Sequence, residues 1–472
     1  MAQYKTPGVY VKEENSFGSS IVSNETAVPV FIGFTEYARN AQGESLNKVE
    51  GSSIVYEPVR ISSVLEYQNS FGGADETGRI YVTETTDNIG GTTYSAENKN
   101  HDGTEDYQPG LMYPSVSNFF SNGGGNCYII SLGQYEDFSK ELASTITDEM
   151  DFIKKAIEMA ESATLILPTD LIRFGDSEYY AWATEFTNFS GQEKKYFTIL
   201  DVVQKDPNNS VYNSTDIDQY RSHVAPEFPS YAGTYFPYLK SLTSYSYRSD
   251  LSNVYLNEDP LTDSENATIE DVKSYLSTNY INMPASPFMA GIYSRLDNAS
   301  GVWTPPANVA PTGVTGPSVS LTNKEQEDLN VDATAGKSIN AIRSFTGKGT
   351  LVWGARTNDG NGLDWRYVNV RRLFISMETD ISKALEAYVF KPNVHNTWVE
   401  VKTMIESYLL GLYNDGAFAG TTPGTSYQVQ IGLGETMTEE DILNGYLRVS
   451  IQVAPVRPAE FIVLTFSQMV GQ

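Results

Sequence analysis

The alternation of short apolar runs with helical patterns between residues 110 and 205 constrains the fold most strongly. The runs at 127–130 and 165–167 are too short for helices and are bounded by glycine or proline. The segments 148–163 and 178–189 have the spacing of helices. Alternating strands and helices are typical of a sheet covered by helices. We therefore predict an α/β unit over this stretch.

Other segments predict further elements of both kinds. The run at 27–34 predicts a buried strand, and 56–75 predicts a strand followed by a short helix. Residues 76–110 are polar, and their apolar residues show no regular spacing, which predicts a surface loop or small insertion. The segments 373–390 and 397–413 predict two helices. The predicted fold class is mixed α/β, or α+β, with several domains in 472 residues.

Both ends of the chain carry short strand-like runs without a neighbouring partner in the sequence. The N-terminal run follows a turn signal, and the C-terminal run is apolar on both faces. So few residues cannot form a stable unit alone, and a doubly apolar strand has to be covered on both sides. We therefore predict that both runs pair with other strands. They are Thr6, Pro7, Gly8, Val9, Tyr10 and Val11, and Phe461, Ile462, Val463, Leu464, Thr465 and Phe466.

Acidic charge is concentrated in the middle of the chain. The formal net charge is −27, and residues 41–280 account for −22 of it, with 37 acidic and 15 basic side chains. Such a chain repels nucleic-acid phosphates and anionic membrane surfaces, so we expect neither as a partner. The middle is expected to be a solvated acidic domain, or the solvent-facing part of an assembly whose near-neutral ends pack together.

Motifs that would indicate catalysis are not found. The segment Gly336-Lys337-Ser338 fails as a phosphate loop, because Val331 stands where that loop needs its first glycine. Cys127 opens a buried-looking strand and is expected to be a core thiol. We expect no enzyme activity, no metal and no cofactor. The three histidines are too widely spaced for a zinc motif: His101, His223 and His395.

The compartment is predicted from what the sequence lacks. The first fifteen residues contain no apolar stretch of the kind found in signal peptides, and no apolar run is long enough to span a bilayer. The single cysteine excludes an intramolecular disulfide. We expect a protein that is made and folded in a reducing cytoplasm.

Several motifs along the chain resemble one family in order and spacing. Three lie in the first half: Tyr4–Val11, Phe119–Gly124 followed by Tyr128, and Tyr231–Leu239, where Tyr238 replaces the usual Trp. The strongest block lies in the second half. It comprises Ala290-Gly291, Gly301–Trp303, Pro306–Asn308, Leu329-Asn330, Asn340, Arg343, Trp353–Thr357 and Tyr367–Arg372. Together they resemble the contractile tail sheath proteins of phage tails, R-type bacteriocins and extracellular injection systems. Residues 76–110 and 240–280 resemble the family least.

This resemblance implies a structural, mechanical function. The protein would polymerise as stacked hexameric rings around an inner tube. It would contract from a metastable extended state and drive the tube through a target envelope. The implied partners are further copies of itself, the inner tube protein, and baseplate and tail terminator or cap proteins, with sibling sheath proteins left open. The particle would be a phage tail or tail-like particle that can be released from the cell.

The family's organisation also implies the domain boundaries. Residues 1–20 and 456–472 would be arms that add strands to the sheets of neighbouring protomers. Residues 21–40 and 281–455 would form a conserved inner domain. Residues 41–280 would form an acidic, outward-facing insertion of one or two lobes.

Two groups of side chains are candidates for contacts between subunits. The helix at 397–413 resembles the family's tube-attachment helix and would use Glu400, Lys402 and Glu406; the alternative is an ordinary solvated helix face. Five arginines concentrate positive charge in an acidic chain and would either meet acidic neighbours between protomers or form internal ion pairs. They are Arg343, Arg356, Arg366, Arg371 and Arg372.

Two other functions are weighed against the sheath. The many Tyr and Asp residues suggest an acidic carbohydrate-binding protein or hydrolase, which would carry a signal peptide and a polar cleft. An inner-tube or baseplate protein of the same machine is the second alternative, but tube proteins are usually much shorter. The sequence leaves open the type of particle, the trigger of contraction and the role of the predicted insertion.

Overall fold

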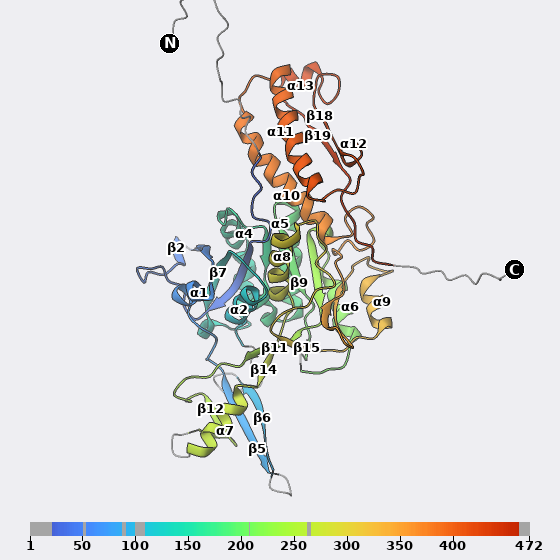
Figure 1. Cartoon of the computed structure of the whole chain (residues 1–472). Coiled ribbons are helices and arrows are strands. Elements are labelled where there is room, and N and C mark those ends of the chain that lie inside the picture. The colour runs from blue at the N-terminus through green and yellow to red at the C-terminus, as the bar shows by residue number, and fades with distance from the viewer. Residues whose placement is uncertain are drawn as a thin grey trace, which may run out of the picture. The chain divides into compact units, whose positions relative to one another are not determined.

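The computed structural model describes residues 21–50, 53–86, 91–99, 109–206, 208–261 and 266–461. The chain divides into two compact units (Figure 1). Among the described residues, the larger unit contains Asn24–Ser376 and 457–461, and the smaller unit contains 21–23 and Met377–Val456. The predicted N-terminal run Thr6–Val11 and the C-terminal residues 462–466 lie outside the described residues.

The larger unit is built on an eight-stranded sheet in the order β17-β16-β10-β9-β8-β1-β7-β4. The six inner strands run parallel, and the two edge strands are antiparallel to their neighbours. This confirms the α/β prediction. The inner strands are β16 (Asn340–Phe345), β10 (Ala232–Phe236), β9 (Phe197–Asp201), β8 (Leu165–Leu167), β1 (Pro29–Thr35) and β7 (Cys127–Gln134). The edge strands are β17 (Gly349–Val352) and β4 (Val59–Ile61).

Helices cover both faces of this sheet. Phe197 and Thr198 follow one another in β9, so their side chains point to opposite faces. The Phe197 ring lies 6.4 Å from the ring of Tyr293 in α8 (Ser286–Ser300), and the Thr198 hydroxyl lies 2.9 Å from that of Ser190 in α5 (Asp176–Glu193). A strand covered on both sides can be apolar throughout, which explains why all seven residues of β1 are buried.

The remaining elements of the larger unit surround this sheet. A three-stranded antiparallel sheet has the order β14-β11-β15, and β2 pairs with β3. These strands are β14 (Tyr280–Met283), β11 (Leu239–Ser244), β15 (Val314–Pro317), β2 (Lys48–Glu50) and β3 (Ser53–Val55). The helices are α1 (Val64–Phe71), α2 (Met112–Ser121), α3 (Leu142–Asp148), α4 (Met150–Met159), α6 (Ser214–His223) and α9 (Asn323–Asn330). Short 3₁₀ turns are η1 (Tyr135–Asp137), η2 (Thr169–Phe174) and η3 (Pro229–Tyr231).

The prediction of a loop at 76–110 is wrong for much of that segment. Residues there form the hairpin of β5 (Arg79–Thr86) and β6 (Thr92–Lys99). This hairpin joins β12 (Val254–Leu256) and β13 (Asp259–Pro260) in a four-stranded sheet, seen with α7 (Asn266–Leu276) in Figure 1. Ile80, Val82 and Val254 contribute to a small separate core with side chains of α7. The hairpin is stabilised by partners distant in sequence, which local periodicity cannot reveal.

The predicted domain boundaries at residues 41 and 280 are also wrong. Strands β7, β8, β9 and β10 come from inside 41–280, yet they pair in one sheet with β1 and β16 from outside it. The predicted inner segment 281–455 is itself divided, because Met377–Val456 forms the smaller unit. Parallel strands are joined by crossover connections, so neighbouring strands of one sheet can come from distant parts of the chain. The change in charge along the sequence therefore does not coincide with a domain boundary. The outward orientation of the acidic segment stays a prediction.

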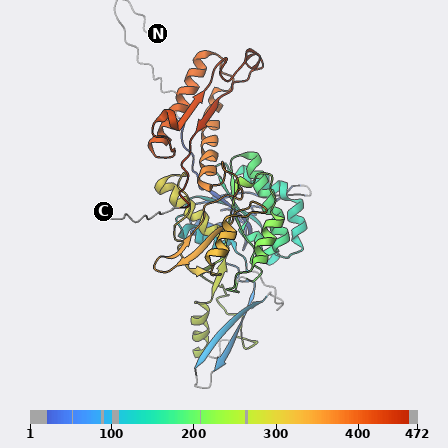
Figure 2. The ribbon, with the colours of Figure 1, turned by 90° about the vertical axis from the view of Figure 1, so that its right-hand side faces the viewer.

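The smaller unit combines helices with a two-stranded sheet (Figure 2). Its helical part is the end of α10 (Val368–Leu385), the 3₁₀ turn η4 (Glu386–Tyr388) and α11 (His395–Asn414), as predicted from the sequence. Val401, Ile405 and Leu409 are fully buried along one side of α11. The rest comprises α12 (Pro423–Ser426), β18 (Tyr427–Gln430), α13 (Glu439–Leu443) and β19 (Ser450–Val453). Among the described residues, no helix of either unit is long and apolar enough to cross a membrane.

Helix α8 approaches α2 so closely that only glycine fits at position 291. A β-carbon there would lie 2.5 Å from the carbonyl oxygen of Phe119 and 2.6 Å from Cβ of Asn122. Both neighbours are held by backbone, so they cannot yield cheaply. This close approach gives a physical reason for Gly291 in the sequence.

We predict that Gly291→Ala lowers the free energy of unfolding by about 1–3 kcal/mol, the usual cost of overpacking. The matched control is Gly411→Ala in α11, where an added β-carbon meets nothing within 4 Å. Alanine favours the helix at that exposed position, so the control should gain about 0.5–1 kcal/mol. Urea denaturation of both variants measures the difference, and equal stabilities would contradict the predicted packing.

Candidate assembly interface

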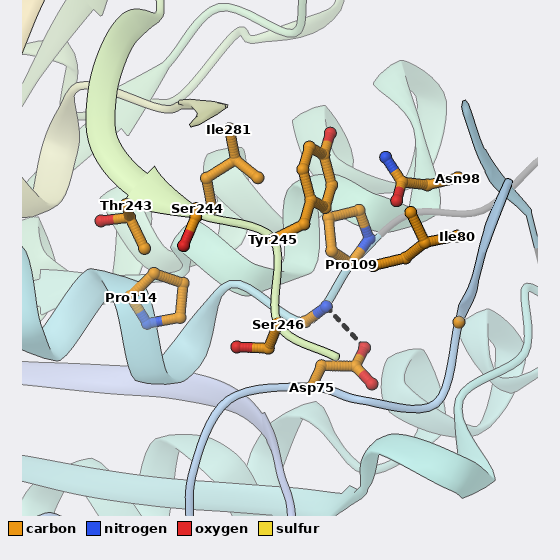
Figure 3. Close-up of a pocket in the computed structure, with 12 residues that line it drawn as sticks. Asp75, Ile80, Asn98, Pro109, Pro114, Thr243, Ser244, Tyr245, Ser246 and Ile281 are labelled. Atoms are coloured by element: carbon orange, nitrogen blue, oxygen red, sulfur yellow. Dashed lines mark hydrogen bonds between the residues drawn. The ribbon is translucent and has the colours of Figure 1, made fainter. Parts of the chain in front are cut away.

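The cavity drawn in Figure 3 is too small for a substrate. It has a volume of about 20 Å³, which is room for about one water molecule. It lies between Ile80 and Asn98 of the β5–β6 hairpin and residues that include Asp75, Pro114 and Tyr245. The Asp75 carboxylate accepts a 2.8 Å hydrogen bond from the Gly110 amide, drawn as the dashed line. A cavity of this size has no room for a substrate.

The Gly336-Lys337 segment uses its amide groups internally. The Asp332 carboxylate accepts hydrogen bonds from the amides of Thr334, Ala335 and Lys337 at 3.0–3.3 Å. The Lys337 amine donates to the carbonyl of Arg221, and burial lowers the pKa of this amine. The donors that would cradle a phosphate therefore already hold a carboxylate. Within the described ranges no group of three His, Cys, Asp or Glu side chains could hold a metal ion.

Cys127 is buried at the start of β7, as expected for a core thiol. Burial raises the pKa of the thiol, which disfavours the reactive thiolate.

Arg371 and Arg372 have internal partners in the larger unit. The Arg372 guanidinium contacts both oxygens of Asp297, at 3.0 and 2.6 Å, and donates to the carbonyl of Thr26. Arg371 donates to the hydroxyls of Ser230 and Tyr231, and its guanidinium lies 3.5 Å from the ring centroid of Trp365. Both side chains are buried. Arg372 therefore forms an internal ion pair, the second alternative, whereas Arg371 has internal hydroxyl and aromatic partners instead.

Arg356 is also buried, and it holds the beginning of the C-terminal segment. Its Nε and Nη2 donate to the two carboxylate oxygens of Glu460 at 2.9 and 2.6 Å. Asn330 Nδ2 donates to Glu460 at 2.9 Å, and the Tyr367 hydroxyl donates at 3.2 Å. Burial acts to raise the pKa of Glu460, but the hydrogen bonds and charge of Arg356 outweigh it and hold the pKa below its usual value. We call Arg356, Asn330, Tyr367 and Glu460 the arm-root clamp.

The central sheet fixes the position of this clamp. Asn340, the first residue of β16, exchanges hydrogen bonds with the Arg356 backbone: Nδ2 donates to its carbonyl and Oδ1 accepts from its amide, both at 2.7 Å. Asn340 Nδ2 also donates to the Thr234 carbonyl of β10. A β-carbon on Gly354 would lie 2.7 Å from Asn340 Oδ1, so the glycine allows this approach. The Trp353–Thr357 motif thereby holds Arg356 at the end of the sheet.

Arg343 and Arg366 are half-buried and remain candidates for contacts between subunits. Arg343 donates to the amide oxygens of Asn323 and Gln326. The five arginines are therefore not one surface cluster, since three of them are buried with internal partners. Their inter-subunit role stays a prediction for Arg343 and Arg366.

The three candidate residues of α11 do not share one face. Lys402 and Glu406 are four residues apart and lie on one flank of the helix, both half-buried. Glu400 lies about 160° away from Lys402 around the helix axis and contacts Lys391, with 3.8 Å between Glu400 Oε2 and Lys391 Nζ. The exposed side of α11 consists mainly of uncharged residues. A search of the sequence for charged residues therefore does not identify this side. The uncharged residues there are Val399, Thr403, Ser407, Leu410 and Gly411.

Exposed apolar side chains also mark the turn between α10 and α11. Phe390 is fully exposed and has a positive φ of 66°, which is unfavourable for a bulky residue. Val389 and Val394 beside it are 63% and 50% exposed. Asn393 anchors the turn through a hydrogen bond from its Nδ2 to the Tyr446 carbonyl. A surface of this kind typically marks a contact with another molecule.

The sheet of the smaller unit has open edges. Strands β18 and β19 pair antiparallel, from Tyr427 with Val453 to Gln430 with Ser450, and no third strand joins them in the part of the chain that the structure describes. Such edges present unpaired amide and carbonyl groups that can accept an added strand. The Phe461 side chain, the first of the predicted C-terminal strand, is 71% exposed.

Comparisons with known proteins agree on one family. Residues 361–468 match the family described as phage tail sheath C-terminal domain. The tail sheath protein of Vibrio phage KVP40 is 26% identical over 188 residues, 39% of this chain, and the match spans about a quarter (26%) of that relative. A chain in the cryo-EM structure of the anti-feeding prophage baseplate has a TM-score of 0.63 at 28% identity and covers 99% of this chain and 100% of its own. A chain of the contracted PVC sheath complex, an extracellular contractile injection system, has the same score and identity and covers 100% of this chain and 99% of its own.

The chain is similar to contractile tail sheath proteins, through the family model at its C-terminal part and through two sheath-related chains over almost its whole length. The predicted recognition and the multidomain α/β sheath fold are therefore confirmed. The roles predicted for the two arms, for α11 in tube attachment, and for Arg343 and Arg366 between subunits are not tested by these comparisons and stay predictions. The pairing of Arg356 with Glu460 was not predicted from the sequence. Arg356 lies within the Trp353–Thr357 motif, and Glu460 directly precedes the predicted C-terminal strand.

We predict that Arg372→Met lowers the free energy of unfolding of the chain by about 3–5 kcal/mol, because Asp297 would remain buried without its counter-charge. Combining it with Asp297→Asn should recover part of that loss. Arg457→Ala, which removes an exposed pair with Asp364, is the control and should change stability by less than about 1 kcal/mol. Urea denaturation measures all three, and a mild effect of Arg372→Met would return that residue to the list of inter-subunit candidates.

Proposed function

We propose that this chain is the structural subunit of a contractile sheath. It polymerises as stacked hexameric rings around an inner tube and contracts from an extended, metastable state to drive the tube through a target envelope. The resemblance over nearly the whole chain to a contracted sheath chain carries this proposal. The match to a chain from a baseplate structure supports a baseplate contact. Inner tube, tail terminator and possible sibling sheath proteins are further proposed partners.

Strand addition would join the subunits. The open edges of β18 and β19 are the proposed acceptors, and the runs 6–11 and 461–466 of neighbouring copies are the proposed donors. Main-chain hydrogen bonds give such a joint its strength, and alternate side chains give it specificity. The acceptor strands have four residues each, so one short donor strand can cover an edge.

The proposed mechanism is mechanical and uses no catalytic residue. Contraction would be driven by contacts between protomers that improve in the contracted packing, since a shift between two states requires a difference in free energy. The sheath protein would hold the tube weakly, through α11 and the neighbouring apolar turn at Val389–Val394. We further propose that the particle is assembled inside the producing bacterium.

The first experiment is negative-stain electron microscopy of the protein, alone and co-expressed with its tube protein. We expect hollow, striated tubes when the tube protein is present, and their diameter and ring spacing would report the extended or contracted state. Monodisperse monomers in the presence of the tube protein would contradict the sheath proposal. In that case binding to polysaccharides would test the carbohydrate-binding alternative.

Removal of the C-terminal strand tests how the subunits join. A chain ending at Glu460 keeps the arm-root clamp but lacks the run that begins at Phe461. We expect a folded protomer with unchanged thermal stability that forms at least tenfold fewer tubes in sedimentation and microscopy. The matched control replaces residues 467–472 with a Gly-Ser segment of equal length and should assemble. Normal tubes from the truncated chain would contradict strand addition by this segment.

A further inference from the structure

The C-terminal segment leaves the smaller unit and becomes fixed again within a few residues. The Val456 amide donates to the Ala417 carbonyl, which is the last backbone bond of the smaller unit. Glu460 is next held by Arg356 in the larger unit. Only residues 457–459 separate these two fixed points, and the four residue steps from Val456 to Glu460 span about 14 Å when extended.

The clamp at Glu460 has the properties of a strong contact. Its two parallel hydrogen bonds from a guanidinium are charge-assisted and define the direction of the carboxylate. The Arg356 and Glu460 side chains are 4% and 21% exposed, so water screens the pair little. By contrast, Arg457 approaches Asp364 at 3.9 Å with both side chains exposed, a contact of little strength.

We propose that the arm-root clamp anchors the C-terminal arm to the larger unit of its own protomer, so that an arm bound to a second copy is tethered through Glu460. This inference rests on the proposed sheath function. Tension on the arm then passes from Glu460 to Arg356, and from there through Asn340 to β10 and β16. Arg356 and Glu460 are positioning residues in this assembly, and the residues after 460 make the contact with the neighbour.

Two insertions of equal size test which point is the anchor. We insert Gly-Ser-Gly-Ser either after Glu460 or between Val456 and Arg457. An anchor at Glu460 makes the first insertion lengthen the free arm, whereas the second adds length before the anchor. We expect at least a tenfold loss of tubes for the first insertion and less than a twofold loss for the second. Equal losses, with both protomers folded in a thermal melt, would overturn the proposal.

Substitution at the clamp supplies a second readout that does not require assembly. Glu460→Gln should speed hydrogen exchange of the Arg356 and Val456 amides, the hydrogen-bonded amides at the two ends of the clamped segment, at least tenfold in the free protomer. Arg457→Ala, the matched control that removes the exposed pair, should leave these rates within twofold. Unchanged exchange in Glu460→Gln would overturn the anchor. The two proposals can fail separately. If the wild-type chain forms no tubes but its exchange rates rise in Glu460→Gln as expected, the sheath function is contradicted and the clamp is supported.

Discussion

The parallel pairing of β10 with β16 is the constraint on which the rest of the larger unit depends. It joins a strand ending at Phe236 to one beginning at Asn340, and Asn340 connects both strands to the backbone of Arg356. The Asn358 side chain extends this network, since its Oδ1 accepts from the Thr234 hydroxyl and its Nδ2 donates to the Tyr220 hydroxyl. The arm-root clamp is thus connected to β10 and β16 of the central sheet by consecutive buried hydrogen bonds.

The sequence could predict the elements whose own residues carry the signal. β1 is almost wholly apolar because both of its faces are covered, and α11 shows the spacing of a helix with one buried side. The hairpin β5–β6 could not be predicted, because its Thr- and Glu-rich strands gain their cover from β12 and α7, more than 150 residues away. The domain boundaries failed for a related reason: charge reports exposure, whereas the sheet order depends on strand pairing.

The sequence indicated which residues deserve attention as candidates, but not which partners they contact. The arginines stand out in an acidic chain, and the sequence left open whether they pair inside or between protomers. Three are buried with partners such as Asp297 and Glu460, which a count of charges cannot identify. On α11, the charged residues attracted attention, yet the exposed side is largely uncharged. Burial is a property of the tertiary fold, so it separates these cases only once neighbours are known.

The shortness of β18 and β19 has a consequence for growth of the proposed polymer. A four-residue edge offers few backbone hydrogen bonds, and each contributes only about 0.5–1.5 kcal/mol net. One such joint cannot offset the entropy lost when two proteins associate. Free subunits would therefore remain dispersed until a template presents several edges together. Growth of this kind has slow nucleation and fast elongation, so the template decides where a particle starts.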